Sequence, residues 1–188
     1  FFRYPQLHKN NRQKMKVHYI LFCLFSIFCY SQKIEWSPKT KLNSSDFKGI
    51  ILNEIDDKAA SSMLSIEYKI VSTSIWTGKI KLKISPTFDS SLSWIKPENI
   101  SENLLNHEQK HFDIAKIFSE KIQSLVNNKI KGTKDFNDSF QKIYDEIYDE
   151  YYEFQKKYDA ETKHGTDIKA QENYDALISE LLKNCNCR

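Results

Sequence analysis

Two histidines and a glutamate in the stretch LLNHEQKHFDIAK, residues 104–116, have the spacing of a zinc site. His107 and His111 are four residues apart, and Glu108 follows the first histidine. On a helix, side chains four apart have Cβ atoms about 5–6 Å from each other, so both imidazoles can point at one metal ion. Glu108 lies one step further round, where its carboxylate can reach a water on that ion. This is the HExxH arrangement of zinc peptidases, with two ligands and a general base.

The helical phase of these three residues puts them on the side that should be buried. At about 100° per residue, one arc contains the motif and the apolar side chains Leu104, Ala115, Phe118, Ile122, Leu125 and Val126. The opposite side carries Lys110, Asp113, Lys116 and Glu120. Because burying ionisable groups without partners is costly, the pattern favours a metal ion between them. The alternatives are a polar cleft lining and a hydrogen-bonded pair of core histidines.

A catalytic zinc site usually has three protein ligands, so the motif is one ligand short. If the first two helices pack as an antiparallel hairpin around residues 132–133, the level of the motif lies opposite about residues 154–158. The candidates near or just beyond that level are Asp159, Glu161 and His164.

These three candidates differ in their position on the second helix. Glu161 continues the inward stripe, whereas Asp159 lies off it and could pair with Lys163 or orient a ligand histidine. His164 lies one to two turns beyond the level of the motif, but Gly165 allows the chain to turn back there. It is also the only histidine after residue 31 outside the motif. We predict His164 as the third ligand, with Glu161 and Asp159 as alternatives; without a metal, His164 would be a surface histidine at a helix end.

The first half of the chain has the pattern of strands. Apolar and polar residues alternate in LSIEYKI, residues 64–70, and in KIKLKI, residues 79–84, which is typical of half-buried strands. We interpret the lysines of the second strand as a solvated face or a protected edge, in preference to a binding stripe. Pro86 and Pro97 enclose a predicted loop.

The second half has the periodicity of helices. Asn99 and Glu102 have the spacing of a capping box, which predicts the start of the first long helix. A second helix follows the turn at 132–133, and a third, capped by Thr166, continues to about Lys183. We therefore predict an α+β domain in which a short antiparallel sheet precedes packed helices, zincin-like, with HExxH on the first long helix.

The N-terminal residues have the features of an export signal. A lysine follows Met15, an apolar run covers residues 19–28, and small residues precede a cut between Ser31 and Gln32. We therefore expect a secreted or periplasmic protein. The predicted division is an upstream translated extension at 1–14, a signal peptide at 15–31 and a single zinc metalloprotease domain at 32–188.

Without the leader the chain loses its basic character. All 25 acidic residues follow Ser31 and 5 of the 28 basic residues precede it, so the remaining chain has a net charge of −2. This charge gives no support to nucleic acid as a partner. The expected partner is a peptide or protein substrate, and we expect no stable membrane span in the mature chain.

The motifs also resemble a known bacterial family. LLNHEQKHFDIA, residues 104–115, is followed after one long helix by YDAETKHG, residues 158–165. This pair is similar to the exported family catalogued as domain of unknown function 922, whose members are described as secreted zinc-dependent proteases. The likeness extends from about Trp36 to Leu181, and it implies zinc as cofactor. His164 is the histidine of the YDxxTxHG motif in that family, which adds to its prediction as a ligand.

These observations predict an exported zinc-dependent hydrolase, a metallopeptidase in which Glu108 activates a water on Zn²⁺. The alternative is a non-catalytic exported module with a structural metal site or a helical interaction surface. An open fourth position on the metal favours the enzyme, and a fourth protein ligand favours the module.

Overall fold

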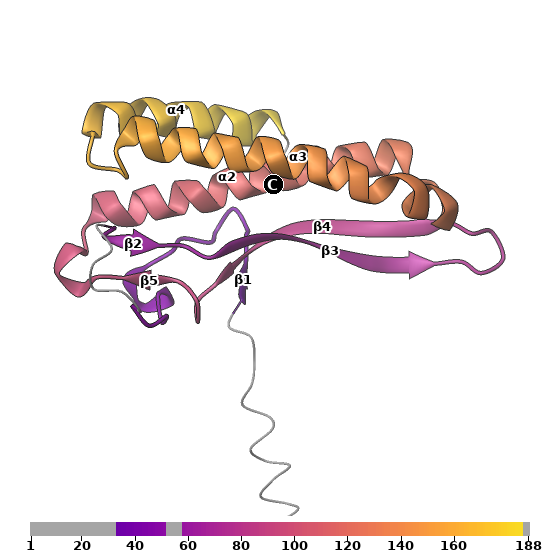
Figure 1. The fold of residues 1–188 in the computed structure, drawn as a ribbon, viewed down its shortest axis with the longest axis horizontal. Helices are drawn as coiled ribbons and strands as arrows, with labels where there is room; N and C mark the ends of the chain where they lie inside the picture. Colours follow the sequence, from indigo (N-terminus) through magenta and orange to yellow (C-terminus); the bar gives the residue numbers. More distant parts are fainter. Residues whose placement is uncertain (1–32, 52–57, 186–188) are drawn as a thin grey trace, which may run out of the picture. The chain divides into compact units, whose positions relative to one another are not determined.

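A computed structural model of the protein describes residues 33–51 and 58–185. Its strands form two antiparallel sheets (Figure 1). The larger sheet has the order β1–β4–β3, and the smaller one pairs β2 with β5. The strands are β1 at Lys33–Glu35, β2 at Ala60–Ser61, β3 at Leu64–Thr73, β4 at Ile80–Asp89 and β5 at Trp94–Ile95. Short 3-10 helices lie at Ser44–Asp46 and Pro97–Asn99.

Three helices follow the sheets: α2 at Glu102–Lys129, α3 at Thr133–Thr162 and α4 at Ile168–Asn184. Helix α2 packs against β3 and β4, and α3 and α4 pack against α2 and against each other (Figure 1). The α+β prediction, with a short antiparallel sheet before packed helices, is therefore confirmed. Each long helix has the apolar stripe that this packing requires.

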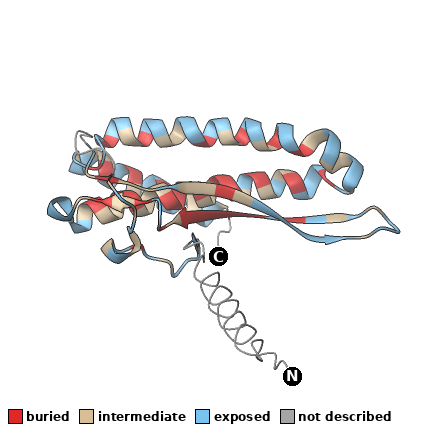
Figure 2. Ribbon diagram, turned by 60° about the horizontal axis from the view of Figure 1, so that its bottom comes forward, coloured by how far each residue is buried: buried red, intermediate tan, exposed pale blue. Residues whose placement is uncertain are grey.

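Helix α2 is buried on more than one side, because strands cover one face and helices another (Figure 2). Phe112 and Ile114 are fully buried although neither belongs to the predicted core arc, in which Leu125 is only partly buried. Asp113, predicted on the polar side, is also buried, and its carboxylate accepts a 2.9 Å hydrogen bond from the indole of Trp36. A helical wheel with one buried arc describes a helix that is covered on one side. Here the N-terminal segment covers a second side of α2.

The caps of α2 and α4 differ from those predicted. Ser101 caps α2, because its hydroxyl accepts a 3.2 Å hydrogen bond from the Leu104 amide, while Asn99 belongs to the preceding 3-10 helix. Asp167, and not Thr166, caps α4. In both places several cap-forming residues lie close together, and the one that caps is the one with extended backbone beside the first turn.

Strand β4 continues through Pro86, where a loop was predicted. Pro86 pairs with Ile66 of β3, and its carbonyl accepts a 3.3 Å hydrogen bond from the Trp36 amide. The strand then contributes Phe88 to the core. The loop prediction is wrong here. Proline lacks the N–H donor of a sheet ladder, but its carbonyl can still accept a hydrogen bond, so Pro86 is compatible with a strand.

The β3–β4 hairpin extends beyond the helical layer at one end (Figure 1). Ile66 is buried, but Tyr68 and Ile70, on the same face of β3, are about half exposed. The alternation of the sequence therefore predicts the strand correctly and overstates how much of it the helices cover.

The described residues belong to one compact unit, residues 32–188, which contains the apolar clusters of the core. None of its described helices combines the length and the apolar character that crossing a bilayer requires. The predicted extension at 1–14 and signal peptide at 15–31 lie outside the described residues.

Candidate metal centre

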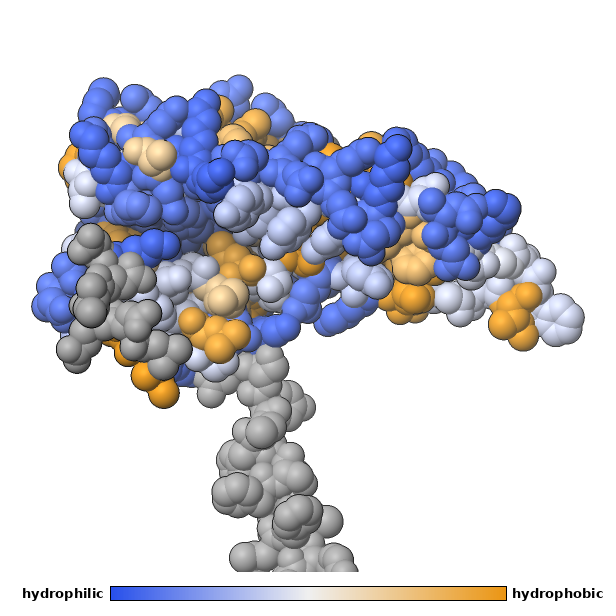
Figure 3. Space-filling view, in the orientation of Figure 1, coloured by the Kyte–Doolittle hydropathy of each residue, from blue (hydrophilic) through white to orange (hydrophobic). Residues whose placement is uncertain are grey.

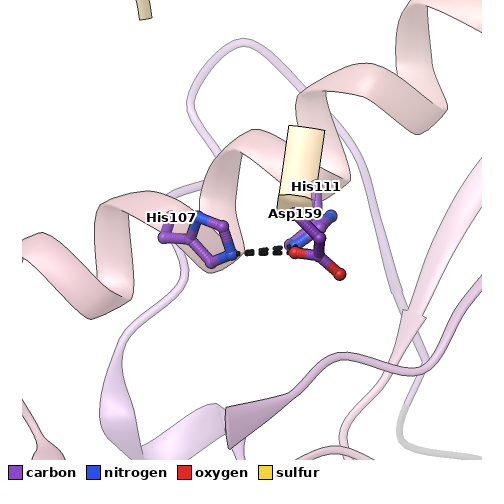
Figure 4. Close-up of side chains that lie close together, drawn as sticks. All are labelled: His107, His111 and Asp159. Atoms are coloured by element: carbon purple, nitrogen blue, oxygen red, sulfur yellow. Dashed lines mark hydrogen bonds and ion pairs between the residues drawn. The ribbon is translucent and has the colours of Figure 1, made fainter. Parts of the chain in front are cut away.

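Three side chains from α2 and α3 converge on one point (Figure 4). The Nε2 atoms of His107 and His111 lie 3.1 Å apart. Oδ1 of Asp159, on α3, lies 3.2 Å from the first and 2.9 Å from the second. The three atoms form a nearly equilateral triangle.

The size and chemistry of this triangle fit a zinc ion. At zinc–ligand distances of about 2.0–2.2 Å, tetrahedral geometry separates the ligand atoms by about 3.3–3.5 Å. The separations of 2.9–3.2 Å are slightly shorter, so little adjustment is needed. Two imidazole nitrogens and a carboxylate oxygen are donors that zinc accepts. All three atoms therefore lie close enough together to bind one ion.

A glutamine holds each histidine from behind. Nδ1 of His107 lies 3.1 Å from Oε1 of Gln171 on α4, and Nδ1 of His111 contacts Oε1 of Gln155 on α3. The amide orientations follow from the network, because Gln171 donates through Nε2 to the hydroxyl of Tyr158 and Gln155 donates to the His111 carbonyl. When the rings are neutral, as metal binding requires, each therefore carries its hydrogen on Nδ1 and presents the Nε2 lone pair to the triangle.

The electrostatics of the site favour a cation at the triangle. Burial opposes the charge on Asp159, but hydrogen bonds from His107 and His111 hold the pKa of its carboxyl well below the usual range. Burial also opposes the charge on His111, but Asp159, Glu108 and Gln155 together raise its pKa above the ordinary value. A carboxylate that stays ionised and an imidazole that holds its proton both indicate that positive charge is stabilised here.

Glu108 and the triangle face a common cavity of about 270 Å³. Glu108 is only 4% exposed, and its Oε2 accepts a 2.5 Å hydrogen bond from the hydroxyl of Ser62. Ser62 belongs to the segment 58–64, which includes β2 and forms one wall of the cavity. Helix α3 contributes Tyr148, Tyr151, Tyr152 and Gln155 to the lining. The motif therefore lies at the wall of a cavity and is not enclosed in the core.

His164 reaches the same cavity through a turn at the end of α3. Lys163, His164 and Gly165 are consecutive residues in the left-handed region, with φ of 50°, 54° and 79°. The turn brings Nδ1 of His164 to 3.4 Å from Oδ1 of Asp159, with the side chain 58% exposed. Gly165 has a further constraint, because a Cβ there would lie 2.9 Å from the Cβ and Cγ of His107. The chain thus turns back toward the cleft at Gly165, as predicted.

The three candidates for the third ligand have different positions. Asp159 supplies one corner of the triangle, and His164 lies beside Asp159, outside the triangle. Glu161 is not brought to the site, since its carboxylate accepts a 2.7 Å hydrogen bond from the hydroxyl of Tyr174. Lys163 pairs with Asp167 and not with Asp159.

Sequence reasoning missed Gln155, Gln171 and Ser62. A signal for Gln155 was present, because it lies four residues before Asp159 and shares its face of α3. Gln171 is almost fully buried, and Ser62 is part of the segment between two strands. Only the packing of α4 and of the smaller sheet brings these two residues to the motif.

A family model matches the central part of the chain. Residues 80–165 match a family described as "Bacterial protein of unknown function (DUF922)". The matched segment runs from β4 to the end of α3 and contains the motif, Asp159 and His164. No curated protein and no solved structure matches. The resemblance inferred from the motifs is confirmed, and the zincin-like architecture stays a prediction.

Proposed function

Residues 80–165 match the model of the DUF922 family, whose function is unknown, so we propose a function from the site itself: a zinc-dependent metallopeptidase. One observation carries the proposal. The Nε2 atoms of His107 and His111 and Oδ1 of Asp159 converge within about 3 Å on the wall of a cavity, beside the carboxylate of Glu108.

In this proposal His107, His111 and Asp159 hold the ion. Gln155 and Gln171 keep the two imidazoles in the tautomer that presents Nε2. When bound by these three residues, zinc would polarise a carbonyl as a Lewis acid and would lower the pKa of a water toward 7.

Glu108 acts as the general base. The hydrogen bond from Ser62 occupies one oxygen of its carboxylate, so the other is left to accept a proton from water in the cavity. The same group then donates that proton to the leaving amine. The cavity favours the enzyme over a structural metal site, because a structural zinc is normally closed by a fourth protein ligand.

Strand β2 supports a peptide as the substrate. Its partner among the described residues is β5, and the carbonyl of Ala59 accepts a 2.9 Å hydrogen bond from the Lys96 amide. Backbone groups alternate in direction along an antiparallel pair, so those of Ala60 and Ser62 face away from β5. Both residues line the cavity. An extended peptide added to this edge would lie across the motif. The export signal predicted at 15–31 would direct this activity to the periplasm or the exterior.

Metal analysis and a cleavage assay on the same preparation test this function. The chain from Gln32, purified without chelators, is expected to contain about one zinc per molecule and to cleave members of a random peptide library. Chelation should abolish cleavage, and added zinc should restore it. Protein that remains metal-free in zinc-containing buffer would exclude the proposal. Zinc binding without cleavage of any peptide would favour the non-catalytic module.

A further inference from the structure

The tip of the β3–β4 hairpin presents two large apolar side chains to solvent. Ile75 and Trp76 lie in the turn between the strands, and they are 91% and 92% exposed. Figure 3 shows this tip as the end of the projecting part of the molecule, with apolar colour next to pale residues. Two adjacent large apolar side chains at this exposure are unusual and indicate a partner.

The turn is held firmly at its base. The Ser74 amide donates to the Lys79 carbonyl at 2.9 Å, and the Gly78 amide donates to the Ser74 carbonyl at 2.8 Å. The Gly78 carbonyl accepts a 2.9 Å hydrogen bond from the amide of Thr133, at the start of α3. Lys79 also forms a bridge with Gly132. These bonds fix the direction in which the tip points, away from the helices.

The hairpin is strongly basic. Residues 68–83 contain no acidic residue and four exposed lysines: Lys69, Lys79, Lys81 and Lys83. Lys69 and Lys83 are directly opposite each other on β3 and β4, and like charges in that position destabilise a strand pair. Glu35 of β1 pairs with Lys83 and offsets part of this repulsion. An anionic surface would offset the rest.

Acidic residues on the neighbouring helix do not neutralise this charge. Asp135 accepts hydrogen bonds from the backbone amides of Lys131 and Gly132 at the start of α3. Asp138 pairs with Lys134. The basic character of the hairpin therefore persists next to the α2–α3 turn.

We propose that the β3–β4 hairpin docks the protein on a bilayer that contains anionic lipid. Trp76 and Ile75 enter the interfacial region, where tryptophan is enriched. The lysines contact anionic headgroups, and their alkyl stems lie along the apolar boundary. A bilayer fits better than a folded partner, because a convex two-residue tip offers far less than the roughly 800 Å² per partner of a stable protein interface.

Docking in this way leaves the metal centre clear of the surface. The tip is bonded to the α2–α3 turn, and His107 lies 22 residues before Lys129, the last residue of α2. This spacing corresponds to about 33 Å along the helix axis. The cavity thus lies near the other end of α2 from the tip of the hairpin. The docking proposal does not depend on the proposed zinc chemistry.

Vesicle binding by the chain from Gln32, the compact unit that contains the described core, tests this proposal. The probes are vesicles of phosphatidylcholine alone and of phosphatidylcholine with 30% phosphatidylglycerol. We expect cosedimentation with the anionic vesicles and little with the neutral ones. Replacing both tip residues, Ile75→Ser with Trp76→Ser, should weaken binding at least ten-fold. Lys79→Gln with Lys81→Gln should weaken it about five-fold per lysine.

Matched variants at the other end of the molecule are the controls. Ile168→Ser removes an exposed apolar side chain from α4, and Lys157→Gln with Lys169→Gln removes two exposed lysines. None of these should change binding. Anionic vesicles should also shift the tryptophan fluorescence to the blue in the native chain and not in Trp76→Phe.

Three results would overturn the proposal. These are no cosedimentation with anionic vesicles, equal binding by the tip variants, or binding that the hairpin lysines do not affect. A dimer that Trp76→Ser abolishes, without vesicle binding, would identify a second copy of the chain as the partner.

Discussion

His107 and His111 present the same nitrogen to the same point because a glutamine holds the other nitrogen of each ring. Gln171 is itself fixed by the Tyr158 hydroxyl, and Gln155 by a backbone carbonyl. The orientation of each imidazole therefore does not depend on a metal, and the proposed site is preorganised for an ion.

Glu108→Gln tests the general base. Glutamine has the same size and can still bond to Ser62, but it cannot accept a proton. We expect zinc content to stay unchanged and peptide turnover to fall about 10²–10⁴-fold. Turnover equal to that of the native chain would contradict the assigned role, and parallel loss of zinc and turnover would make Glu108 a structural group.

Single substitutions compare the candidates for the third ligand. Asp159→Ala should reduce zinc affinity at least about 100-fold, because it removes one corner of the triangle and leaves two imidazoles. Glu161→Ala should leave affinity unchanged, since Glu161 bonds to Tyr174. Titration of each folded variant with zinc gives the comparison. If His164→Ala loses as much affinity as Asp159→Ala, then His164 is a ligand, as the sequence predicts.

The pH dependence of zinc affinity follows from the same residues. Zinc needs neutral imidazoles, so protons compete with it. The pKa of His111 is raised in the metal-free protein, so this competition begins above pH 6.5, and affinity falls as the pH is lowered. The pKa of Asp159 is lowered, so its carboxylate stays ionised over this range. We expect about a ten-fold loss per pH unit for each histidine that must lose a proton. Zinc affinity measured by competition from pH 5.5 to 8 tests this expectation, and an affinity that stays constant over that range would contradict it.

At the scale of elements, the site depends on how α3 ends. Two non-glycine residues, Lys163 and His164, adopt left-handed backbone there, which costs about 1–3 kcal/mol each. That strain persists because the turn is bonded on both sides: the Asn103 side chain donates to the Gly165 carbonyl, and the His164 amide donates to the Asp159 carbonyl. The same turn packs Gly165 against the imidazole of His107.

Gly165→Ala should weaken both the fold and the metal site. Its positive φ and the contact with His107 both oppose a Cβ, so we expect a loss of more than about 1 kcal/mol of stability and weaker zinc binding. Gly78→Ala is the matched control, because Gly78 also has positive φ but its nearest neighbour, Oγ1 of Thr133, is 3.9 Å away. The Gly78→Ala variant should lose a similar amount of stability, because alanine is strained at positive φ, and should keep its zinc affinity. Thermal melts and zinc titrations of both variants separate the two effects, and equal zinc affinity in both would remove the role of Gly165 at the site.

At the scale of the molecule, the proposed metal site joins parts of the chain that are far apart in sequence. Asp159 follows His107 by 52 residues, and the supporting groups come from α4 and from the β2–β3 segment. An ion that binds only this folded arrangement stabilises the whole unit by mass action.

Zinc should therefore raise the melting temperature. At a free concentration 100 times Kd, the stabilisation is about 2.7 kcal/mol, or about 5–10 °C for a domain of this size. Chelation should reverse it, and Asp159→Asn should show little of it. Equal melting temperatures with and without zinc would show that the native fold does not bind the ion.

Local patterns in the sequence determined much of this protein. The period-two and helical repeats predict β3, β4 and the long helices, and the HExxH spacing puts the buried His107 and Glu108 and the partly buried His111 on one face. These features are predictable because they depend on residues close together in the sequence. The periodicity of a helix or strand decides which of its side chains share a face.

Only the tertiary structure decided which distant groups meet that face. The position of Asp159 at the triangle depends on the packing of α3 against α2, and the glutamine behind His107 depends on α4. The same holds for exposure, since Tyr68 and Ile70 follow the buried pattern of a strand but are about half exposed, although the ring of Tyr68 contacts Phe140 of α3. Contacts between elements depend on their relative placement, and no local spacing encodes it.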